Sequence, residues 1–389
     1  MRNGYGEGPV LLRIAGRNLA LVLSADHVRR VLEGSPDPFD IAGREKRAAL
    51  SHFQPNGVLI SHGSERAVRR RLNEAALDSS QPIHRLGDEL VATARDEATV
   101  LVAEAERSGS LTWGDFSAGW WRAVRRIVLG DVARDEVALT DALWRLRRDA
   151  NWAYLKPKRT ALRDLFLDRL EDHLSRAEPG SLAAVLAATP PPPASEPAHQ
   201  VSHWLFAFDA AGMASFRALA LIDANPRESE RARHEALQAD MSRPQPLPFL
   251  RACMLESLRL WPTTPAILRE TSTETRWDSG TMPPKTAALI FVPYFHRNRE
   301  SLAGADSFTP DIWLNGHSRR DWPLVPFSAG PAECPGRNLV LLVTSSMLAT
   351  LLENHRLRQL HPRPLVAGNP LPGTLSPFRL RFGIAARQS

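Results

Sequence analysis

"PFSAGPAECPGRN", residues 326–338, contains Cys334, one of only two cysteines in 389 residues. The cysteine lies between a loop rich in proline and glycine and a long apolar run, "LVLLVTSSMLATLL" (339–352). A thiol in this place can be a packed core group, half of a disulfide, a nucleophile or a metal ligand. Each alternative requires different residues elsewhere in the chain, so the remaining sequence is needed to choose between them.

The bulk composition is that of a soluble globular protein. Hydrophobic residues make up 43% and charged residues 24% of the chain, which is enough to bury a large core with a cofactor inside it. The other cysteine is Cys253, so a disulfide framework is excluded and a reducing cytoplasm is expected. The first residues lack a secretory signal, and no run reaches about 18 uncharged apolar residues, so no membrane span is predicted.

The net charge is +6, carried mostly by arginine. The densest basic run, "RAVRRRL" (66–72), is not interleaved with aromatic residues and accompanies no nucleic-acid motif. Binding of DNA or RNA is therefore not predicted. A basic face for an acidic protein partner stays open.

The apolar periodicity predicts a mainly α-helical protein with a small β component. Two short strands and a helix are predicted within residues 10–32, and helices dominate 82–178. Residues 33–63 and 297–333 are predicted to be loops. The central run "VSHWLFAFDAAGMASFRALALI" (201–222) needs burial on nearly all sides. The prolines of residues 188–200 before it therefore indicate a connection lying over one domain, and further short strands are predicted at 286–292 and 379–384.

Three ordered motifs give the chain a resemblance to the cytochrome P450 family. Residues 327–336 read Phe-Ser-Ala-Gly-Pro-Ala-Glu-Cys-Pro-Gly, which is similar to the family's haem-binding signature. Glu256 and Arg259 fit its Glu-x-x-Arg helix, and residues 211–215 lie where the oxygen-activation motif belongs in the long central helix. The resemblance covers essentially the whole chain. It implies one P450 domain over 1–389, with haem b buried between the central and cysteine-side helices.

The resemblance assigns the cysteine loop to the haem. Cys334 is implied as the axial thiolate ligand of the iron, which pushes electron density onto the metal. Phe327 is expected to shield the sulfur, while Gly330 and Gly336 allow tight turns and close approach to a flat macrocycle. Pro335 is expected at the first helical position, so that the helix N-terminus favours the thiolate.

Four further residues are implied around this loop. Glu256 and Arg259 share one helix face; a surface ion pair is the plain alternative, but the resemblance implies a buried structural pair that fixes the loop. Arg269 and Arg69 match positions whose guanidinium groups bind the haem propionates. For Arg69 a solvated arginine is the alternative, because other arginines crowd around it.

The sequence departs from the family pattern at three positions outside the central helix. Ala332 replaces a basic residue two before the cysteine, so one propionate partner is missing. Glu65 stands where a histidine is usual, four residues before Arg69, and is expected to point elsewhere or to pair with an arginine. Ile312 replaces the arginine that usually joins Glu256 and Arg259.

The central helix departs from the pattern more seriously. The usual acid and threonine are replaced by Ala214 and Ser215. Ala211, Gly212 and Ser215 remain as catalytic candidates: Gly212 is expected to permit a local distortion with room for dioxygen, and the Ser215 hydroxyl to hold a water or relay a proton. Asp209 is expected to project from a different face of the helix.

The predicted function is a monooxygenase that inserts one oxygen atom from dioxygen into a small, lipophilic substrate, such as a terpenoid or another intermediate of secondary metabolism. A separate ferredoxin and its reductase are expected to supply electrons. The substrate pocket is predicted to be lined by residues 39–59, Phe208, Ala211, "TPAIL" (264–268) and "LPGTL" (371–375).

Two alternatives stay open. The missing acid at Ala214 is compatible with a haem-thiolate enzyme that uses peroxide, or that ends in coupling, desaturation or rearrangement. A non-catalytic haem protein is the other. A hydrolase is disfavoured because no nucleophile-elbow motif is present, and the histidines lack the spacing of a metal site.

Overall fold

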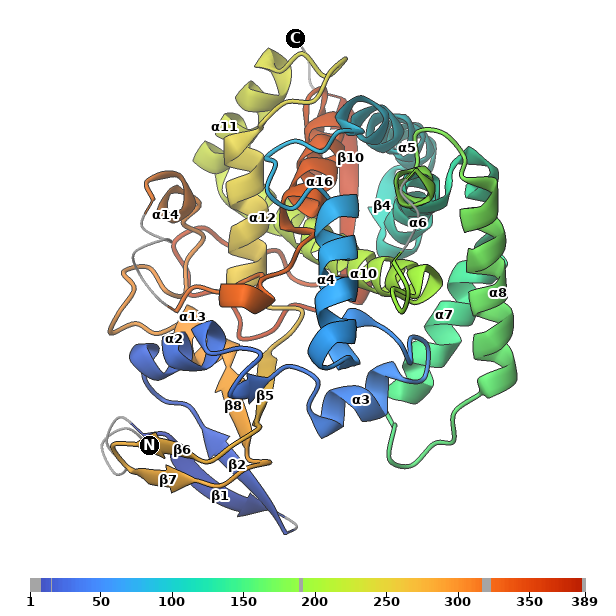
Figure 1. Ribbon diagram of the computed structural model, residues 1–389. Coiled ribbons are helices and arrows are strands. Elements are labelled where there is room, and N and C mark those ends of the chain that lie inside the picture. The colour runs from blue at the N-terminus through green and yellow to red at the C-terminus, as the bar shows by residue number, and fades with distance from the viewer. Residues whose placement is uncertain (1–7, 15, 189–191, 317–322, 387–389) are drawn as a thin grey trace.

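The computed structural model describes residues 8–14, 16–188, 192–316 and 323–386. Helices make up most of it, with small sheets at opposite ends (Figure 1). The predicted class, mainly α with a small β component, is confirmed. Residues 189–191 of the predicted proline-rich connection and 317–322 of the predicted loop stretch lie outside the described residues.

The helices follow one another through the whole chain. In order they are α2 (Ala25–Glu33), α3 (Arg44–Leu50), α4 (Gly63–Ala76), α5 (Gly87–Ser108), α6 (Trp113–Leu129), α7 (Val137–Ala150), α8 (Thr160–Arg176), α9 (Leu182–Ala187), α10 (Pro197–Ala224), α11 (Pro226–Gln238), α12 (Pro248–Leu260), α13 (Val292–His296), α14 (Asp311–Leu314) and α16 (Arg337–Leu352). Short 3-10 turns lie at Val58–Ile60, Asp131–Ala133, Gly330–Ala332 and Pro377–Arg379.

The strands form three small sheets. The largest has the order β1 (Val10–Ile14), β2 (Arg17–Leu21), β8 (Ala287–Phe291), β5 (Ala266–Thr271) and β3 (Phe39–Asp40). Only β2 and β8 run parallel in it, with Leu19 opposite Ala287. A second sheet contains β4 (Ser110–Thr112), β10 (Arg381–Ala386) and β9 (His355–His361), and a third joins β6 (Thr275–Trp277) to β7 (Gly280–Met282).

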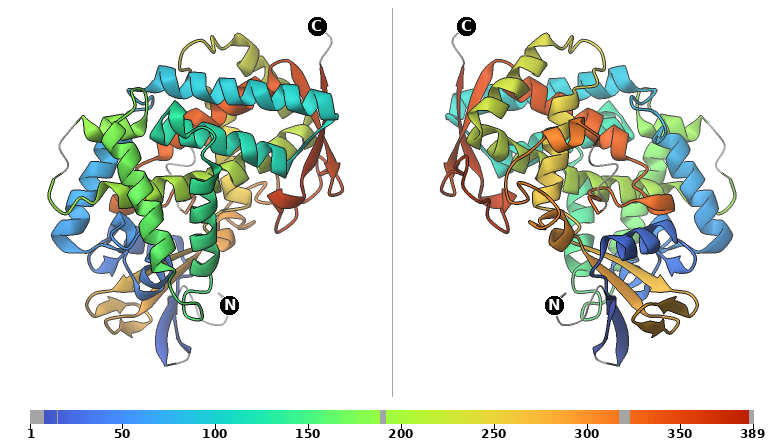
Figure 2. Two further views of the ribbon diagram at one scale, coloured as in Figure 1. Left: turned by 90° about the vertical axis from the view of Figure 1, so that its right-hand side faces the viewer. Right: turned by 90° about the vertical axis from the view of Figure 1, so that its left-hand side faces the viewer.

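The helix α10 runs through the middle of the molecule (Figure 2). It packs against α6, α8, α12 and α16, which is why a helix with apolar residues on nearly every side is stable here. By length and composition α10 could also cross a membrane, but 72% of its most apolar window is buried inside the protein. The expected burial of residues 201–222 is thus confirmed.

The helix α3 contradicts the prediction that residues 33–63 form a loop. It is seven residues long, and Leu50 is its only buried residue. A helix with a single buried residue leaves no apolar repeat in the sequence, so periodicity could not reveal it. It lies beside the lower end of α4, close to the β5–β8 region (Figure 1).

Candidate functional site

The cysteine loop is held by its own backbone. The Cys334 N–H donates to the Phe327 carbonyl over 3.0 Å, and the Glu333 N–H donates to the Gly330 carbonyl over 2.9 Å. Gly330 has φ +67°, and a Cβ there would lie 2.4 Å from the Leu32 carbonyl oxygen. Only glycine fits this position, because the loop crosses the end of α2 at backbone contact.

The end of the loop differs from expectation at two residues. Helix α16 begins at Arg337, so Pro335 lies in the preceding turn and not at the first helical position. Gly336 has φ −89°, which any residue adopts, and a Cβ there would meet only ordinary contacts, 4.0 Å from Cys334 Sγ. Its backbone N–H faces the sulfur instead.

The Cys334 thiol is surrounded by protein and still accessible. Burial raises its pKa above the ordinary value, while the Gly336 N–H and the Arg70 guanidinium act in the opposite direction. The residue nevertheless keeps accessible surface, as does Phe327 beside it. A deep thiol with accessible surface borders an interior space, as a metal ligand requires; it is neither a tightly packed core group nor part of a disulfide.

Glu256 and Arg259 form a fully buried bidentate pair, with Nε–Oε1 at 2.6 Å and the second Nη–Oε2 at 2.8 Å. Arg259 also donates to the backbone carbonyls of His296, Ala305 and Ser307. The surface-pair alternative is therefore wrong. The Glu256–Arg259 pair is linked to the cysteine loop through His296: Arg259 bonds the His296 carbonyl, and His296 Nε2 accepts the Val325 N–H over 2.8 Å.

The third partner of this pair was missing from the sequence analysis. Trp313 Nε1 donates to Glu256 Oε1 over 2.9 Å, and the Thr309 N–H donates to Oε2 over 2.8 Å. Trp313 follows Ile312 directly, so the helix α14 supplies an indole where an arginine was sought.

Helix α4 joins the cysteine loop to the central helix. Arg70 donates to the Glu333 carbonyl over 2.7 Å, next to Cys334. Three residues later, Asn73 accepts the indole N–H of Trp204 over 2.6 Å and donates to Gln200 over 3.2 Å. The side of α4 that carries Arg70 and Asn73 therefore faces the region between the cysteine loop and α10.

The Arg69 side chain is held by contacts within the protein. Its Nε donates to the Ala194 carbonyl over 3.0 Å, and one Nη donates to Ser61 Oγ over 2.5 Å and lies 3.2 Å from Glu65. The side chain is buried and not solvated, and its Nε and one Nη are bonded within the protein. Glu65 pairs with an arginine, as expected.

The neighbouring Arg66 differs from Arg69 in its contacts. Its Nε is buried and has no hydrogen-bond partner among the described residues. Burial and the nearby charge of Arg66 lower the pKa of Arg269 to about 10. Burial and the charges of Arg269 and Arg66 lower the pKa of Lys46 to about 7. Arg269 also donates to Ser328 of the cysteine loop over 3.3 Å. We call Arg66, Arg269 and Lys46 the cation cluster.

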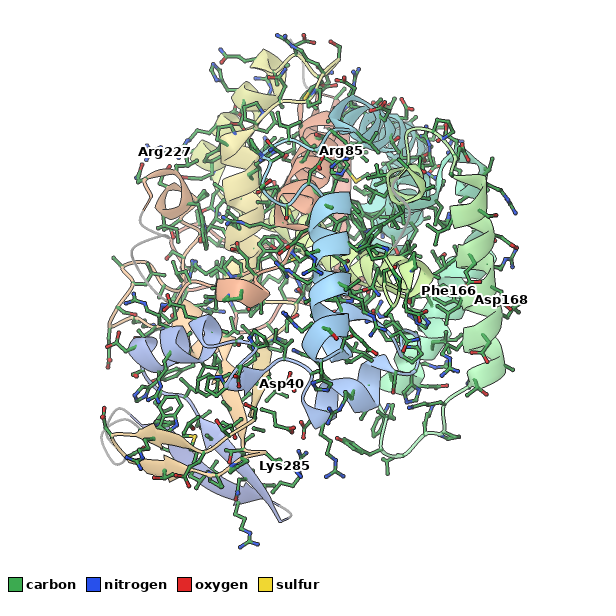
Figure 3. All side chains as sticks on the ribbon, viewed as in Figure 1. Asp40, Arg85, Phe166, Asp168, Arg227 and Lys285 are labelled. Atoms are coloured by element: carbon green, nitrogen blue, oxygen red, sulfur yellow. The ribbon has the colours of Figure 1, made fainter. Side chains whose placement is uncertain are left out.

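Glu74 acts on Arg66, and Asp40 acts on all three members of the cation cluster. Asp40 lies on the edge strand β3, near the lower end of α4 (Figure 3). It already pairs with His62 over 3.0 Å. The positive charge of the cluster is therefore only partly balanced. His62 precedes Arg66 by four residues, so the expected histidine–arginine spacing is present three residues earlier than the sequence analysis placed it.

The motif of α10 is packed on the side of α6 and α12. Ser215 is fully buried and its Oγ donates to the Ala211 carbonyl over 2.9 Å. The Ala214 carbonyl accepts Ser257 Oγ over 2.7 Å. Asp209 pairs with Arg147 over 2.6 Å, on the different face that was expected.

Gly212 and Phe208 serve packing here. A Cβ at Gly212 would lie 2.7 Å from the Trp120 indole, and Trp120 Nε1 donates to the Phe208 carbonyl over 2.8 Å. The Phe208 ring itself lies 6.1 Å from that of Trp120. The space next to Gly212 thus belongs to Trp120, not to dioxygen, and Phe208 faces α6, not a pocket.

A different stripe of α10 stays partly exposed although the helix is central. The stripe repeats every three or four residues and consists of His203, Phe206, Ala207, Ala210 and Met213. The protein therefore does not fully cover this face of α10. We take this stripe, the accessible Cys334 and the cation cluster as the candidate site.

Comparisons with known proteins indicate the family of the chain and its fold. Residues 213–374 match the family described as Cytochrome P450. Cytochrome P450 4g15 of Drosophila melanogaster is 31% identical over 157 residues, 38% of this chain and 27% of that protein. Cyclooctat-9-en-7-ol 5-monooxygenase of Streptomyces melanosporofaciens is 32% identical over 130 residues, 33% of this chain and 26% of that protein. The matches therefore span about a quarter of these relatives' lengths.

Two solved structures show the same fold over nearly the full length. The retinoic acid-bound cyanobacterial CYP120A1 superposes with a TM-score of 0.80 at 17% identity, covering 99% of this chain and 93% of that one. The haem domain of cytochrome P450DA gives 0.77 at 17% identity, covering 98% and 89%.

Proposed function

Because the chain belongs to the cytochrome P450 family, whose cofactor is haem iron, we propose that it is a haem-thiolate monooxygenase formed by one domain over residues 1–389. The observation that carries the proposal is that Cys334, which keeps accessible surface, lies near a cation cluster whose charge is only partly balanced. A thiolate suits the iron at the centre of a haem, and the cations suit the propionates at one edge of the macrocycle.

The residues present fit the cofactor. Cys334 would bind the iron, and Gly330 and the Phe327 carbonyl fix the loop that presents the sulfur. Arg66 and Arg269 would hold the propionates, because the buried Nε of Arg66 has no described partner and a buried donor is costly to leave unpaired. Arg70, which neighbours the thiol, supplies positive charge close to the position where Ala332 replaces a basic residue.

When bound, the haem-thiolate supplies the electron-rich iron that activates dioxygen. The chain's own part is to exclude water and to hold a proton near the site. Ser215 is fully buried and donates its hydroxyl hydrogen to the Ala211 carbonyl, so it would act only through a buried water held by its oxygen lone pairs. Asp209 cannot take over from the missing acid at Ala214, because it is paired with Arg147.

Electrons are proposed to come from a separate ferredoxin and its reductase in the cytoplasm. The net charge of +6 favours an acidic carrier. Arg71, Arg337 and Arg70 lie on the elements that flank the cysteine loop, where an electron has the shortest path to the iron.

The proposed substrate is a lipophile such as a terpenoid. Phe53, Phe206 and the alanines of the α10 stripe offer an apolar wall. Two similar proteins carry names that refer to lipophiles bearing one oxygen function, an alkenol and retinoic acid. That chemistry supports a substrate of the same class here.

A second candidate is a P450 that accepts hydrogen peroxide, favoured by Ala214, whose carbonyl is bound by Ser257 and whose side chain cannot deliver a proton. The test is product formation from a lipophile panel with a ferredoxin, its reductase and NADPH, against hydrogen peroxide alone. Turnover in the first system with little peroxide release supports the monooxygenase. Turnover only with peroxide overturns it in favour of the second candidate.

Ser215→Ala should increase peroxide release. If the ratio of product to released peroxide is unchanged, Ser215 serves only packing.

A further inference from the structure

The segment 51–62 lies along the first half of α10 and contacts it in register. Ser202 Oγ donates to the Phe53 carbonyl over 3.1 Å. Gln200 donates to the Asn56 carbonyl over 3.0 Å and accepts the Val58 N–H over 3.0 Å. These contacts fix the segment against α10, next to the accessible stripe of that helix.

The contact between Gln54 and His203 leaves hydrogen-bonding capacity unused. Gln54 Nε2 and His203 Nδ1 lie 3.1 Å apart, which joins the segment to the accessible stripe of α10. Gln54 is 1% exposed, yet its Oε1 has no hydrogen-bond partner among the described residues. His203 Nε2 likewise has no bond to the described part of the chain, and the ring keeps accessible surface. By contrast, the amide of Gln200 is fully bonded.

The surroundings of His203 are mainly aromatic, with Lys46 as the nearby charged group. Its ring lies 5.8 Å from that of Phe206, which in turn lies 5.3 Å from Phe53. The nearby Arg147 stacks on the far ring, Phe206, and is neutralised by Asp209. The imidazole is neutral at pH 7, because burial and Lys46 lower its pKa to about 4. It therefore offers one uncharged hydrogen-bonding nitrogen inside an aromatic wall.

We infer that the Gln54–His203 pair is a specificity-determining anchor for a substrate that is apolar except for one uncharged oxygen, best a hydroxyl. With Gln54 Nε2 donating to Nδ1, His203 carries its hydrogen on Nε2 and donates it to the oxygen of the substrate. If the amide turns so that its Oε1 accepts from Nδ1–H, Nε2 becomes an acceptor for the hydroxyl hydrogen. A hydroxyl satisfies both arrangements, whereas a hydrocarbon leaves a buried nitrogen unpaired.

The inference rests on the proposed function, so its test uses the haem-loaded protein. Binding of matched pairs is measured by the shift of the resting haem absorption: 1-adamantanol against adamantane, and farnesol against farnesene. The wild-type protein should bind each alcohol more tightly than its hydrocarbon. His203→Phe, which keeps the ring, should reduce that preference about three- to tenfold, the net worth of one neutral hydrogen bond. Gln54→Leu should reduce it in the same direction, because the tautomer of His203 is no longer fixed.

His199→Phe is the matched control. His199 lies one turn earlier on α10 and meets Asn56 over 3.5 Å through Nε2, so its loss should leave the preference unchanged. The inference is overturned if the wild type binds alcohols no better than hydrocarbons, including the case in which no alcohol binds, or if His203→Phe keeps the wild-type ratio. The reduced, carbon monoxide-bound spectrum of each variant is recorded separately. A thiolate-type spectrum together with an unchanged ratio sinks only the anchor and leaves the proposed function standing.

Discussion

The indole of Trp313 donates a hydrogen bond of 2.9 Å to Oε1 of Glu256, the carboxylate of the buried Glu256–Arg259 pair that is linked to the cysteine loop. With the Thr309 N–H and the two bonds from Arg259, it completes the donors around a carboxylate that is 0% exposed. A buried carboxylate needs a full set of donors, because each missing hydrogen bond leaves part of the carboxylate's desolvation free energy without compensation.

Removing one partner should therefore be costly. Trp313→Phe should lower the free energy of unfolding by about 2 kcal/mol, because the variant lacks a hydrogen bond to a charged group. Glu256→Gln should cost about 3–5 kcal/mol, because Arg259 is left as an uncompensated buried charge. Urea unfolding of the haem-loaded protein measures both.

Asp311→Asn is the control for these variants. Asp311 lies in the same helix as Trp313 but pairs with Arg231 at the surface, with its side chain 51% exposed. Such a pair is worth about 0–1 kcal/mol. A loss for Trp313→Phe no larger than for Asp311→Asn would contradict the role given to the indole.

Arg66 and Arg69 should separate into two phenotypes. Arg66→Ala should leave the fold intact and release haem roughly tenfold faster, because the variant lacks a charge-assisted hydrogen bond to a propionate. Arg69→Ala should instead cost about 2–3 kcal/mol in unfolding free energy, because the Ala194 carbonyl and Ser61 lose their buried donor. Transfer of haem to excess apomyoglobin and urea unfolding distinguish them. The reverse pattern would return the propionate role to Arg69.

The sequence predicted the cysteine loop and the Glu256–Arg259 pair because both are local motifs with fixed spacing. It could not choose between the arginines of α4 for the propionate role, because Arg66, Arg69 and Arg70 share one helix and only the contacts show that Arg69 bonds the Ala194 carbonyl. Trp313 was missed for the same reason: its partner lies 57 residues away in the chain. The helix α3 and short strands such as β3 were missed because they carry too few buried residues to leave a pattern.

Gly212 should be required by Trp120. Gly212→Ala should cost about 1–3 kcal/mol in unfolding free energy, because the new methyl group would lie within contact distance of the indole. Adding Trp120→Phe to Gly212→Ala should recover part of this loss, because the free-energy effects of mutations at two contacting residues are not additive. Purely additive costs in a double-mutant cycle would show that Gly212 serves something other than this packing.

The pH dependence of stability should contain a contribution from His296. Burial, followed by the charge of Arg259, lowers its pKa from 6.5 to about 3. Above about pH 6.5 the ring is neutral in both states and the Val325 bond is fully present. As the pH falls from 6.5 toward 3, His296 binds a proton in the unfolded chain but stays neutral in the folded protein. The free energy of unfolding then falls by about 1.4 kcal/mol per pH unit for this group.

His296→Gln removes that titration and can still accept the Val325 N–H through its amide oxygen. Its unfolding free energy, measured from about pH 8 to about pH 4.5, should fall less steeply than that of the wild type. Parallel curves for the two proteins would contradict the assignment of a neutral, buried His296.

The reduced, carbon monoxide-bound absorption spectrum tests the central claim most directly. Thiolate ligation by Cys334 predicts the strongly red-shifted Soret band for which the family is named, and its disappearance in folded, haem-loaded Cys334→Ser. A wild-type protein that is folded and haem-loaded but lacks the band, or a Cys334→Ser variant that keeps it, would contradict the account.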